Sequence, residues 1–341
     1  DVAFGCWGKL RIDGQPVDAA TNHPQPLGSC GVRVLGNGDA SNLDPVPPGQ
    51  EGVRNANLFW YSVAVQPTSG TITVVNYKVK GIADESQSYN ESEFSVEDSD
   101  PLTPGQNSLA VGSGPIAIDT DTAGCHLLTA NTGTCDLSVI DLDRLVTNAD
   151  GVVSSRSITA GGQPLLARPA AMAAVDLASP IGVACPADPI GIHYIAYPDC
   201  HAVAAVDAAT GEVVASIRFG ADGTATLGDG ALICPRQCGE RDPIIDGARP
   251  VALDIVRDDR VGVGTQKLAI ALDNRPVATV VTLDVGGLPT TVQQIDLEGD
   301  IGTIDVALSK QITMGGDQVR ELRLVAVTGA VVEAVGHATH G

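Results

Sequence analysis

The chain has 341 residues, and its 41 aspartate and glutamate residues outnumber its 20 lysine and arginine residues, for a formal net charge of −21 at pH 7. A chain this acidic is repelled by nucleic-acid backbones and by anionic membrane surfaces, so we expect neither as a partner. No apolar run approaches the roughly 20 residues of a membrane-spanning helix, so we expect no transmembrane segment. Few aromatic residues (3%), with 39 glycines and 21 prolines, favour short strands joined by turns over long helices.

The first 50 residues are rich in glycine and proline and contain Cys6 and Cys30. We expect residues 1–50 to form an irregular segment tied together by a disulfide between these two cysteines. The sequence opens at Asp1 without a signal peptide, which is typical of the mature segment of an exported protein. We therefore expect a soluble protein that is extracellular, at the cell surface or periplasmic.

A hairpin and an acidic stretch follow. The apolar runs 59–65 and 71–75 flank Pro67-Thr68-Ser69-Gly70, a turn sequence, and predict two paired strands. Residues 84–100 are acidic and rich in serine. They lack the spaced Asp/Asn/Gly pattern of a calcium-binding EF-hand loop, so we interpret them as a solvated loop between strands.

Three stretches of the chain then repeat one pattern of strands. Each opens on a strand led by proline and continues through an apolar strand and an Asn/Asp/Gly turn. A strand ending in aspartate follows, and often a fourth strand. The clearest units are 108–160, 167–220 and 247–297, with insertions at 183–191 and 221–247. Four antiparallel strands per unit, repeated, is the plan of a β-propeller blade.

One segment carries a conflicting local signal. Residues 170–178 read Ala-Ala-Met-Ala-Ala-Val-Asp-Leu-Ala, a composition with high helix propensity. The alignment of the repeats places the same residues on an inner strand, where small side chains suit the crowded centre of a propeller. Because tertiary context commonly overrides propensity, we predict a strand.

The repeat resembles the YVTN-type β-propeller family, whose members carry a proline-led Ala-Val strand, a Val-Ala-Asn strand and a strand ending in Val-Ile-Asp. The corresponding residues here are 114–119, 127–133 and 137–142, and the likeness covers about half of the chain. The resemblance implies an exported bacterial protein with an all-β fold, residues 1–341 forming one propeller of about seven four-stranded blades, with six or eight as alternatives. We expect strands from both termini to pair and close the ring.

Disulfides explain the cysteines better than metal binding does. The eight cysteines are Cys6, Cys30, Cys125, Cys135, Cys185, Cys200, Cys234 and Cys238. None of them forms a C-x-x-C pair, and neighbouring residues of a strand point to opposite faces, so Cys125 and His126 could not easily share an ion. An even count without a redox motif indicates disulfides in an oxidising compartment.

Two pairings stay open for the cysteines of the repeats. Either each unit closes internally, Cys125 with Cys135 and Cys185 with Cys200, or neighbouring units are bridged, Cys125 to Cys185 and Cys135 to Cys200. In a hairpin turning at 132–133, residue 125 lies about 17 Å along the strand from the position opposite Cys135, whereas a disulfide needs Cα atoms within about 7 Å. Inheritance of a pair with each repeat favours internal closure instead. Cys234 and Cys238 could close a tight ring of their own.

Catalytic and cofactor-binding motifs are not evident. There is no G-x-S-x-G elbow, and Gly262 to Lys267 lacks the spacing of a phosphate-binding loop. Asp119 and Asp121 are weak calcium candidates, although the turn after a first strand is also where aspartate is expected on structural grounds. We expect no other cofactor.

Three functions are compatible with these observations. The leading hypothesis is a non-enzymatic exported scaffold or interaction propeller, which could assemble with copies of itself into a larger extracellular or cell-surface structure. Its partners would be proteins or further copies of the chain. The alternatives are a lactonase-like propeller hydrolase, with acidic metal ligands at one mouth of the channel, and a cation- or glycan-binding module that uses the acidic loops.

Overall fold

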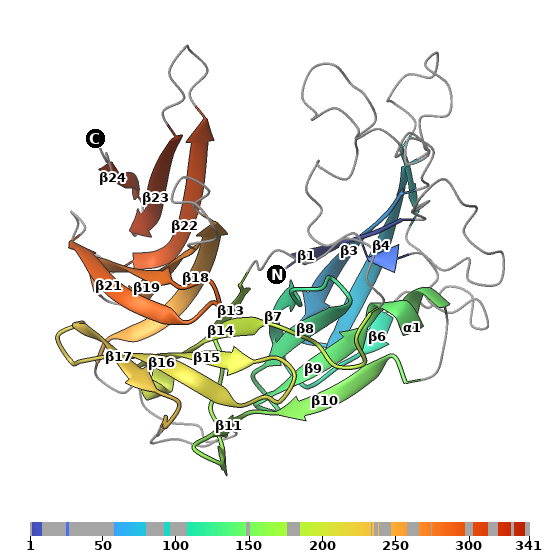
Figure 1. The fold of residues 1–341 in the computed structure, drawn as a ribbon, viewed down its shortest axis with the longest axis horizontal. Coiled ribbons are helices and arrows are strands. Elements are labelled where there is room, and N and C mark those ends of the chain that lie inside the picture. Colours follow the sequence, from blue (N-terminus) through green and yellow to red (C-terminus); the bar gives the residue numbers. More distant parts are fainter. Residues whose placement is uncertain are drawn as a thin grey trace.

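The protein folds almost entirely into antiparallel β-strands, which form separate sheets in chain order (Figure 1). In the described residues, the exceptions are the helix α1 (Leu142–Thr147) and the 3-10 turn η4 (Pro198–Cys200). The computed structural model describes residues 2–8, 25–26, 58–79, 92–95, 108–147, 151–175, 185–232, 234, 238, 247–257, 266–273, 275–296, 303–312, 320–328 and 331–337.

Sheet A holds the N-terminal strands. Its members are β1 (Val2–Gly8), β2 (Gln25–Pro26), β3 (Leu58–Gln66), β4 (Thr71–Val79), β5 (Ser92–Ser95) and β6 (Ser108–Ala110). β3 and β4 form the predicted hairpin, and Gly70 takes a φ of 66° in its turn. β1 pairs with β3 along its whole length, although residues 1–50 were expected to be irregular. The predicted Cys6–Cys30 bond and most of the acidic stretch lie outside the described residues.

Sheet B comes next, in the order β10-β9-β8-β7. Its strands are β7 (Pro115–Thr120), β8 (His126–Asn131), β9 (Asp136–Asp141) and β10 (Val153–Ser157), and the two-stranded sheet C, β11 (Thr159–Ala160) with β12 (Gln163–Pro164), follows. Ala130 pairs with Leu137, not with Cys135 as the sequence predicted. The reason is that Cys135 takes a φ of 54° and donates its N–H to the carbonyl of Asn131, which enlarges the turn and shifts the register by two residues.

Sheet D is a five-stranded meander. Its strands are β13 (Ala171–Ala174), β14 (Ile192–Tyr197), β15 (Ala202–Asp207), β16 (Val213–Phe219) and β17 (Ala225–Asp229). β13 confirms the predicted strand in the alanine-rich segment for the four residues that it spans. β17 lies inside the predicted insertion 221–247, because Gly220 and Thr224 close a turn that starts a fifth strand.

Sheets E and F complete the described chain. Sheet E contains β18 (Arg249–Arg257), β19 (Gln266–Asp273), β20 (Val277–Leu283) and β21 (Pro289–Asp296). Sheet F contains β22 (Thr303–Ile312), β23 (Arg320–Thr328) and β24 (Val331–His337). Sheets E and F each pair their strands in simple chain order.

The sheets are placed around an arc, with sheets A and F at its two ends (Figure 1). The first strands lie together: β7 contacts β1 and β13, and β18 contacts β13 and β22. The expected ring closure by strands from both termini is not found in the described residues, because β1 already pairs with β3 and sheet F contains only C-terminal strands.

Apolar cores fill the spaces between neighbouring sheets. Successive residues of one strand pack into different cores, because successive side chains of a strand point to opposite faces of its sheet. In β14, Ile195 packs toward sheet B, whereas Tyr194 packs toward sheet E. In β8, Leu128 belongs to the core between B and D, whereas Leu127 belongs to the core between A and B. Sheets A, B, D and E therefore pack face to face, and sheets B and D each lie between two neighbours.

Candidate functional site

Four titratable side chains lie close together where one end of sheet B meets sheet D, and three of them, Asp121, His126 and His193, are buried. We call this place the B–D junction and define it by Asp119, Asp121, His126 and His193. Asp119 is the last residue but one of β7, Asp121 opens the β7–β8 turn, His126 begins β8, and His193 lies near the start of β14. It contains both residues that the sequence identified as weak calcium candidates.

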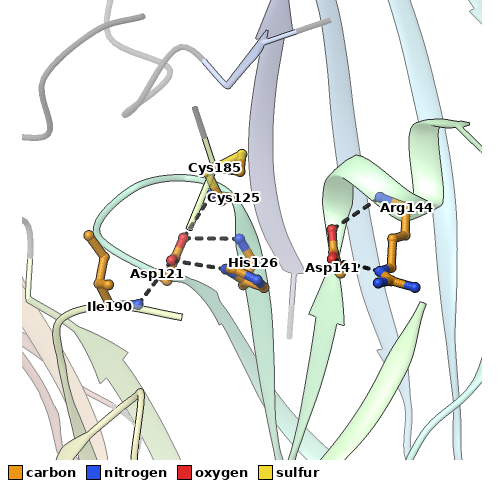
Figure 2. Close-up of a disulfide and its surroundings, with 7 residues drawn as sticks. All are labelled: Asp121, Cys125, His126, Asp141, Arg144, Cys185 and Ile190. Atoms are coloured by element: carbon orange, nitrogen blue, oxygen red, sulfur yellow. Dashed lines mark hydrogen bonds and ion pairs between the residues drawn. A yellow bond between two sulfur atoms is a disulfide. The ribbon is translucent and has the colours of Figure 1, made fainter. Parts of the chain in front are cut away.

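Asp121 is the hub of the B–D junction, and its side chain is buried (Figure 2). One carboxylate oxygen accepts the N–H groups of Cys125 and His126, at 2.8 and 3.0 Å. The other accepts the N–H of Ile190 at 3.1 Å and faces Nδ1 of His126 at 3.2 Å. A buried carboxylate is tolerated only when its oxygens are bonded in this way. Asp121 therefore fixes its own turn and ties it to the loop before β14.

Asp119 makes a second link between the same two sheets. Its Oδ2 accepts the N–H of Ala174 in β13 at 2.8 Å, and its Oδ1 accepts the N–H of Thr120 at 2.8 Å. Both calcium candidates thus have their oxygens directed at backbone amides. Among the described residues, no group of three or more His, Cys, Asp or Glu side chains is placed to hold a metal ion.

His193 is the residue of the junction that sequence reasoning missed. Its ring is 1% exposed, and neither ring nitrogen makes a hydrogen bond of ordinary geometry. Burial lowers the pKa of His193, because the charged ring would lose its hydration; the nearby Asp119 and Asp121 and the backbone of Thr120 act in the opposite direction. Nothing local in the sequence Ile192-His193-Tyr194 distinguishes this histidine from any other strand residue.

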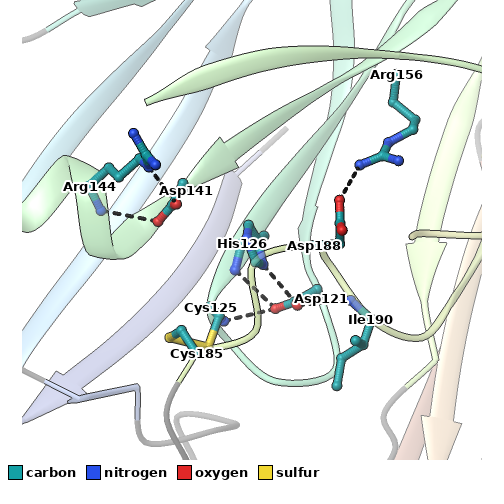
Figure 3. Close-up of polar contacts among 9 residues, drawn as sticks. All are labelled: Asp121, Cys125, His126, Asp141, Arg144, Arg156, Cys185, Asp188 and Ile190. Atoms are coloured by element: carbon teal, nitrogen blue, oxygen red, sulfur yellow. Dashed lines mark hydrogen bonds and ion pairs between the residues drawn. A yellow bond between two sulfur atoms is a disulfide. The ribbon is translucent and has the colours of Figure 1, made fainter. Parts of the chain in front are cut away.

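A disulfide closes the same end of the two sheets. Cys125, beside the Asp121 turn, is bonded to Cys185 with a Cα–Cα distance of 5.6 Å (Figure 2). Arg156 of β10 reaches the same loop from the other side and pairs with Asp188 at 3.0 Å (Figure 3). Cys125–Cys185 is the bond expected from bridging between neighbouring units, and the internal pairing of Cys125 with Cys135 is not formed.

The opposite end of sheets B and D carries two further disulfides. Cys135, in the β8–β9 turn, is bonded to Cys238, and Cys200, in η4, is bonded to Cys234. The expected Cys135–Cys200 bond, the internal Cys185–Cys200 bond and the tight Cys234–Cys238 ring are therefore wrong. The segment after β17 supplies both new partners and links the two turns. Three disulfides indicate that the chain folds in an oxidising environment, as found outside the cytosol.

Comparisons with known proteins give distant structural likenesses. No family model matches the chain, and no curated protein matches it. Hydrazine synthase of Kuenenia stuttgartiensis is similar with a TM-score of 0.32 and 12% identity, over 80% of this chain and 64% of that one. The dihydro-heme d1 dehydrogenase NirN, in complex with DHE, is similar with a TM-score of 0.33 and 13% identity, over 82% and 54%. A functionally unknown protein from Desulfotomaculum acetoxidans has a TM-score of 0.36 and 12% identity, over 81% of both chains.

The chain spans less than two thirds of the length of the first two structures, and TM-scores this low transfer neither function nor blade number. Within the described part of the chain, no helix has the length and apolarity needed to cross a membrane.

Proposed function

We propose that this chain is an exported, non-enzymatic β-propeller that acts as an extracellular or periplasmic scaffold or interaction protein. The observation that carries the proposal is that both carboxylate oxygens of Asp121 are occupied by hydrogen bonds within the fold. The two carboxylates of the B–D junction, Asp121 and Asp119, accept backbone N–H groups from sheet B and from the β13–β14 region of sheet D. Groups engaged in this way hold the fold together and have little capacity left for a substrate or a cation.

The propeller is itself part of the proposal. Sheets that follow in chain order, with their first strands together, support it, as does the packing of sheets B and D against a neighbour on each face. We propose about seven blades, as the repeat implies. Disulfides that anchor the longest loops at both ends of sheets B and D support a rigid body suited to displaying loops to a partner.

Substitution of Asp121 tests the proposal. If Asp121 has a structural role, Asp121→Asn lowers the midpoint of thermal unfolding, and added CaCl2 shifts neither the wild-type nor the variant midpoint. Asp222→Asn, which makes the same chemical change on a fully exposed turn, is the matched control and is expected to leave the midpoint almost unchanged.

The alternatives predict different results in the same experiment. A cation-binding module would be stabilised by calcium in the wild type but not in Asp121→Asn, by mass action on the folded state. A lactonase-like hydrolase would cleave a lactone with a bound metal, and Asp121→Asn would abolish the cleavage while the fold persisted. Either result would contradict the scaffold proposal.

A further inference from the structure

Two of the disulfides depend on one short segment of the chain. Cys234 is bonded to Cys200 in η4 of sheet D, and Cys238 is bonded to Cys135 in the β8–β9 turn of sheet B, with Cα–Cα distances of 4.6 and 5.9 Å. Cys234 and Cys238 are four residues apart. The thiol of either one, once released, therefore stays close to the disulfide of the other.

In both bonds, the cysteine of this segment is the more accessible partner. Cys135 is 3% exposed and Cys200 is 9% exposed, whereas Cys234 and Cys238 are half-buried. A reducing thiolate attacks the sulfur that it can reach, and the sulfur on the other side of the bond departs. Attack on either bond is therefore directed at the segment and releases the cysteine that is held in η4 or in the β8–β9 turn.

The surroundings of Cys238 disfavour a thiolate at its position in the oxidised protein. Its sulfur lies 3.2 Å from the carbonyl oxygen of Gly133 and 3.7 Å from that of Thr132. Both oxygens carry a partial negative charge, so they repel a Cys238 thiolate that is left beside them. Reduction of the Cys135–Cys238 bond thus favours movement of Cys238 away from Cys135, and the chain keeps it within reach of Cys234.

A disulfide between Cys234 and Cys238 is within the reach of the chain that joins them. A disulfide needs Cα atoms about 4.4–6.8 Å apart. Residues four apart on a helical turn are separated by about 6 Å along its axis and lie on the same face. A thiol this near its target attacks at a high effective concentration. The ring that the oxidised protein does not form is therefore open to the partly reduced one.

We propose that Cys234 and Cys238 are an exchange pair, which makes the covalent link between sheets B and D sensitive to reduction. A dithiol reductant gives two electrons to the Cys135–Cys238 bond, which becomes two thiols while the dithiol becomes a disulfide. The Cys238 thiolate then attacks the sulfur of Cys234. A Cys234–Cys238 bond forms, the Cys200–Cys234 bond breaks, and the Cys200 thiolate that departs takes up a proton, as Cys238 gave one up. Initial attack at Cys234 leads to the same product through the corresponding steps.

One two-electron reduction thereby removes both covalent links at this end of the two sheets. The product carries thiols at Cys135 and Cys200 and one disulfide within the segment. Without the exchange, the release of both turns takes two such reductions. The exchange goes beyond the proposed scaffold function and does not depend on it.

Partial reduction followed by alkylation tests the exchange. The oxidised protein is treated with one equivalent of dithiothreitol, alkylated with iodoacetamide, and mapped by mass spectrometry of its peptides under non-reducing conditions. Among molecules with two labels on the four cysteines, we expect Cys135 and Cys200 to be labelled together, with Cys234–Cys238 closed. This pair should outnumber Cys135 labelled with Cys238 by about tenfold, as expected for a fast intramolecular step.

Cys200→Ala with Cys234→Ala is the matched control, because it leaves Cys238 without a disulfide to attack. This variant should be labelled at Cys135 together with Cys238, and circular dichroism establishes that it folds. If it does not fold, labelling of the wild-type protein decides the question by itself. Any predominant pair in the wild type other than Cys135 with Cys200 overturns the proposal. None of these outcomes affects the Asp121→Asn experiment, so the scaffold proposal and the exchange can fail separately.

Discussion

The contact between sheets B and D and the contact between sheets D and E are stabilised by different means. Both contain an apolar core of fully buried side chains. Between sheets B and D, three disulfides and the buried Asp121 are added to that core. Between sheets D and E, the described links are noncovalent, such as the hydroxyl of Tyr194 donating to the carbonyl of Gly287 at 2.8 Å and Arg249 paired with Asp199 at 3.5 Å.

The disulfides occur where a long loop is attached to the sheets. The segments that carry Cys185, Cys234 and Cys238 are longer than a hairpin turn, and these cysteines are bonded to Cys125, Cys200 and Cys135. Long loops cost more entropy to close and lack a core of their own, so covalent anchoring stabilises them where packing cannot. Four experiments test this comparison.

Asp121→Ala should have the largest effect. It leaves two buried N–H groups, those of Cys125 and His126, and the partly buried N–H of Ile190 without an acceptor. We expect a loss of about 3–5 kcal/mol in the free energy of unfolding, the cost of removing one partner from a buried charged network. Equilibrium denaturation in urea measures it. A loss below that of a single neutral hydrogen bond would show that the junction does not depend on this carboxylate.

Removing the Cys125–Cys185 disulfide should have the second-largest effect on stability. Cys125→Ser with Cys185→Ser releases a bond that spans 60 residues of sequence. We expect a loss of about 2–4 kcal/mol, less than the loop length alone would give, because the other bonds still restrict the unfolded chain. Urea denaturation under oxidising conditions measures the loss. Unchanged stability would mean that the core between B and D needs no covalent support.

The buried His193 should make the junction sensitive to acid. Its pKa in the folded protein is lowered from the ordinary value of 6.5, so the unfolded chain binds the proton first. Stability is therefore unaffected well above pH 6.5 and falls as the pH drops below it. The groups facing the ring are Asp119, Asp121 and the backbone of Thr120. His193→Phe should reduce the loss of stability between pH 7.5 and 5.5, and an unchanged pH profile would contradict this assignment.

Substitution of two buried tyrosines should have the smallest effects, and the two variants form a matched pair. Tyr194→Phe removes the hydrogen bond to Gly287 between sheets D and E and should cost about 1 kcal/mol. Tyr197 of the same strand faces the core between B and D, and its buried hydroxyl has no hydrogen-bond partner. Tyr197→Phe should therefore be neutral or stabilising. Thermal unfolding of both variants measures the difference, and equal losses would show that the hydroxyl of Tyr194 adds nothing to the contact.

The strands of the repeat were predictable because their signal is local. Proline-led apolar runs, the Asn/Asp/Gly turns and the small residues of Ala171–Ala174 each restrict the backbone within a few residues. The turn formed by Asp121 belongs to the same class, since an aspartate before Gly124 indicates a turn. That its second oxygen binds Ile190 could not be predicted, because the contact joins segments 69 residues apart.

The Cys125–Cys185 bond was one of the two alternatives, whereas the partners of Cys135 and Cys200 escaped prediction for a related reason. The left-handed backbone of Cys135 shifts the hairpin register, and nothing in Thr134-Cys135-Asp136 marks it as left-handed. Its partner, Cys238, comes from a segment outside the repeat, whose path the repeat does not describe. His193 was missed because its burial is decided by the packing of two sheets, not by its neighbours in sequence.

Cys234 and Cys238 are four residues apart, yet they are bonded to turns of different sheets. Four residues span at most about 14 Å when fully extended. Because of this short connection, η4 and the β8–β9 turn cannot move far apart, even if the apolar core between them loosens. The separation of sheets B and D at this end is therefore limited by covalent bonds. Sheets D and E have no such disulfide link in the described residues. Partial opening of the molecule should therefore begin between sheets D and E, and the fragment containing sheets B and D should separate as one unit.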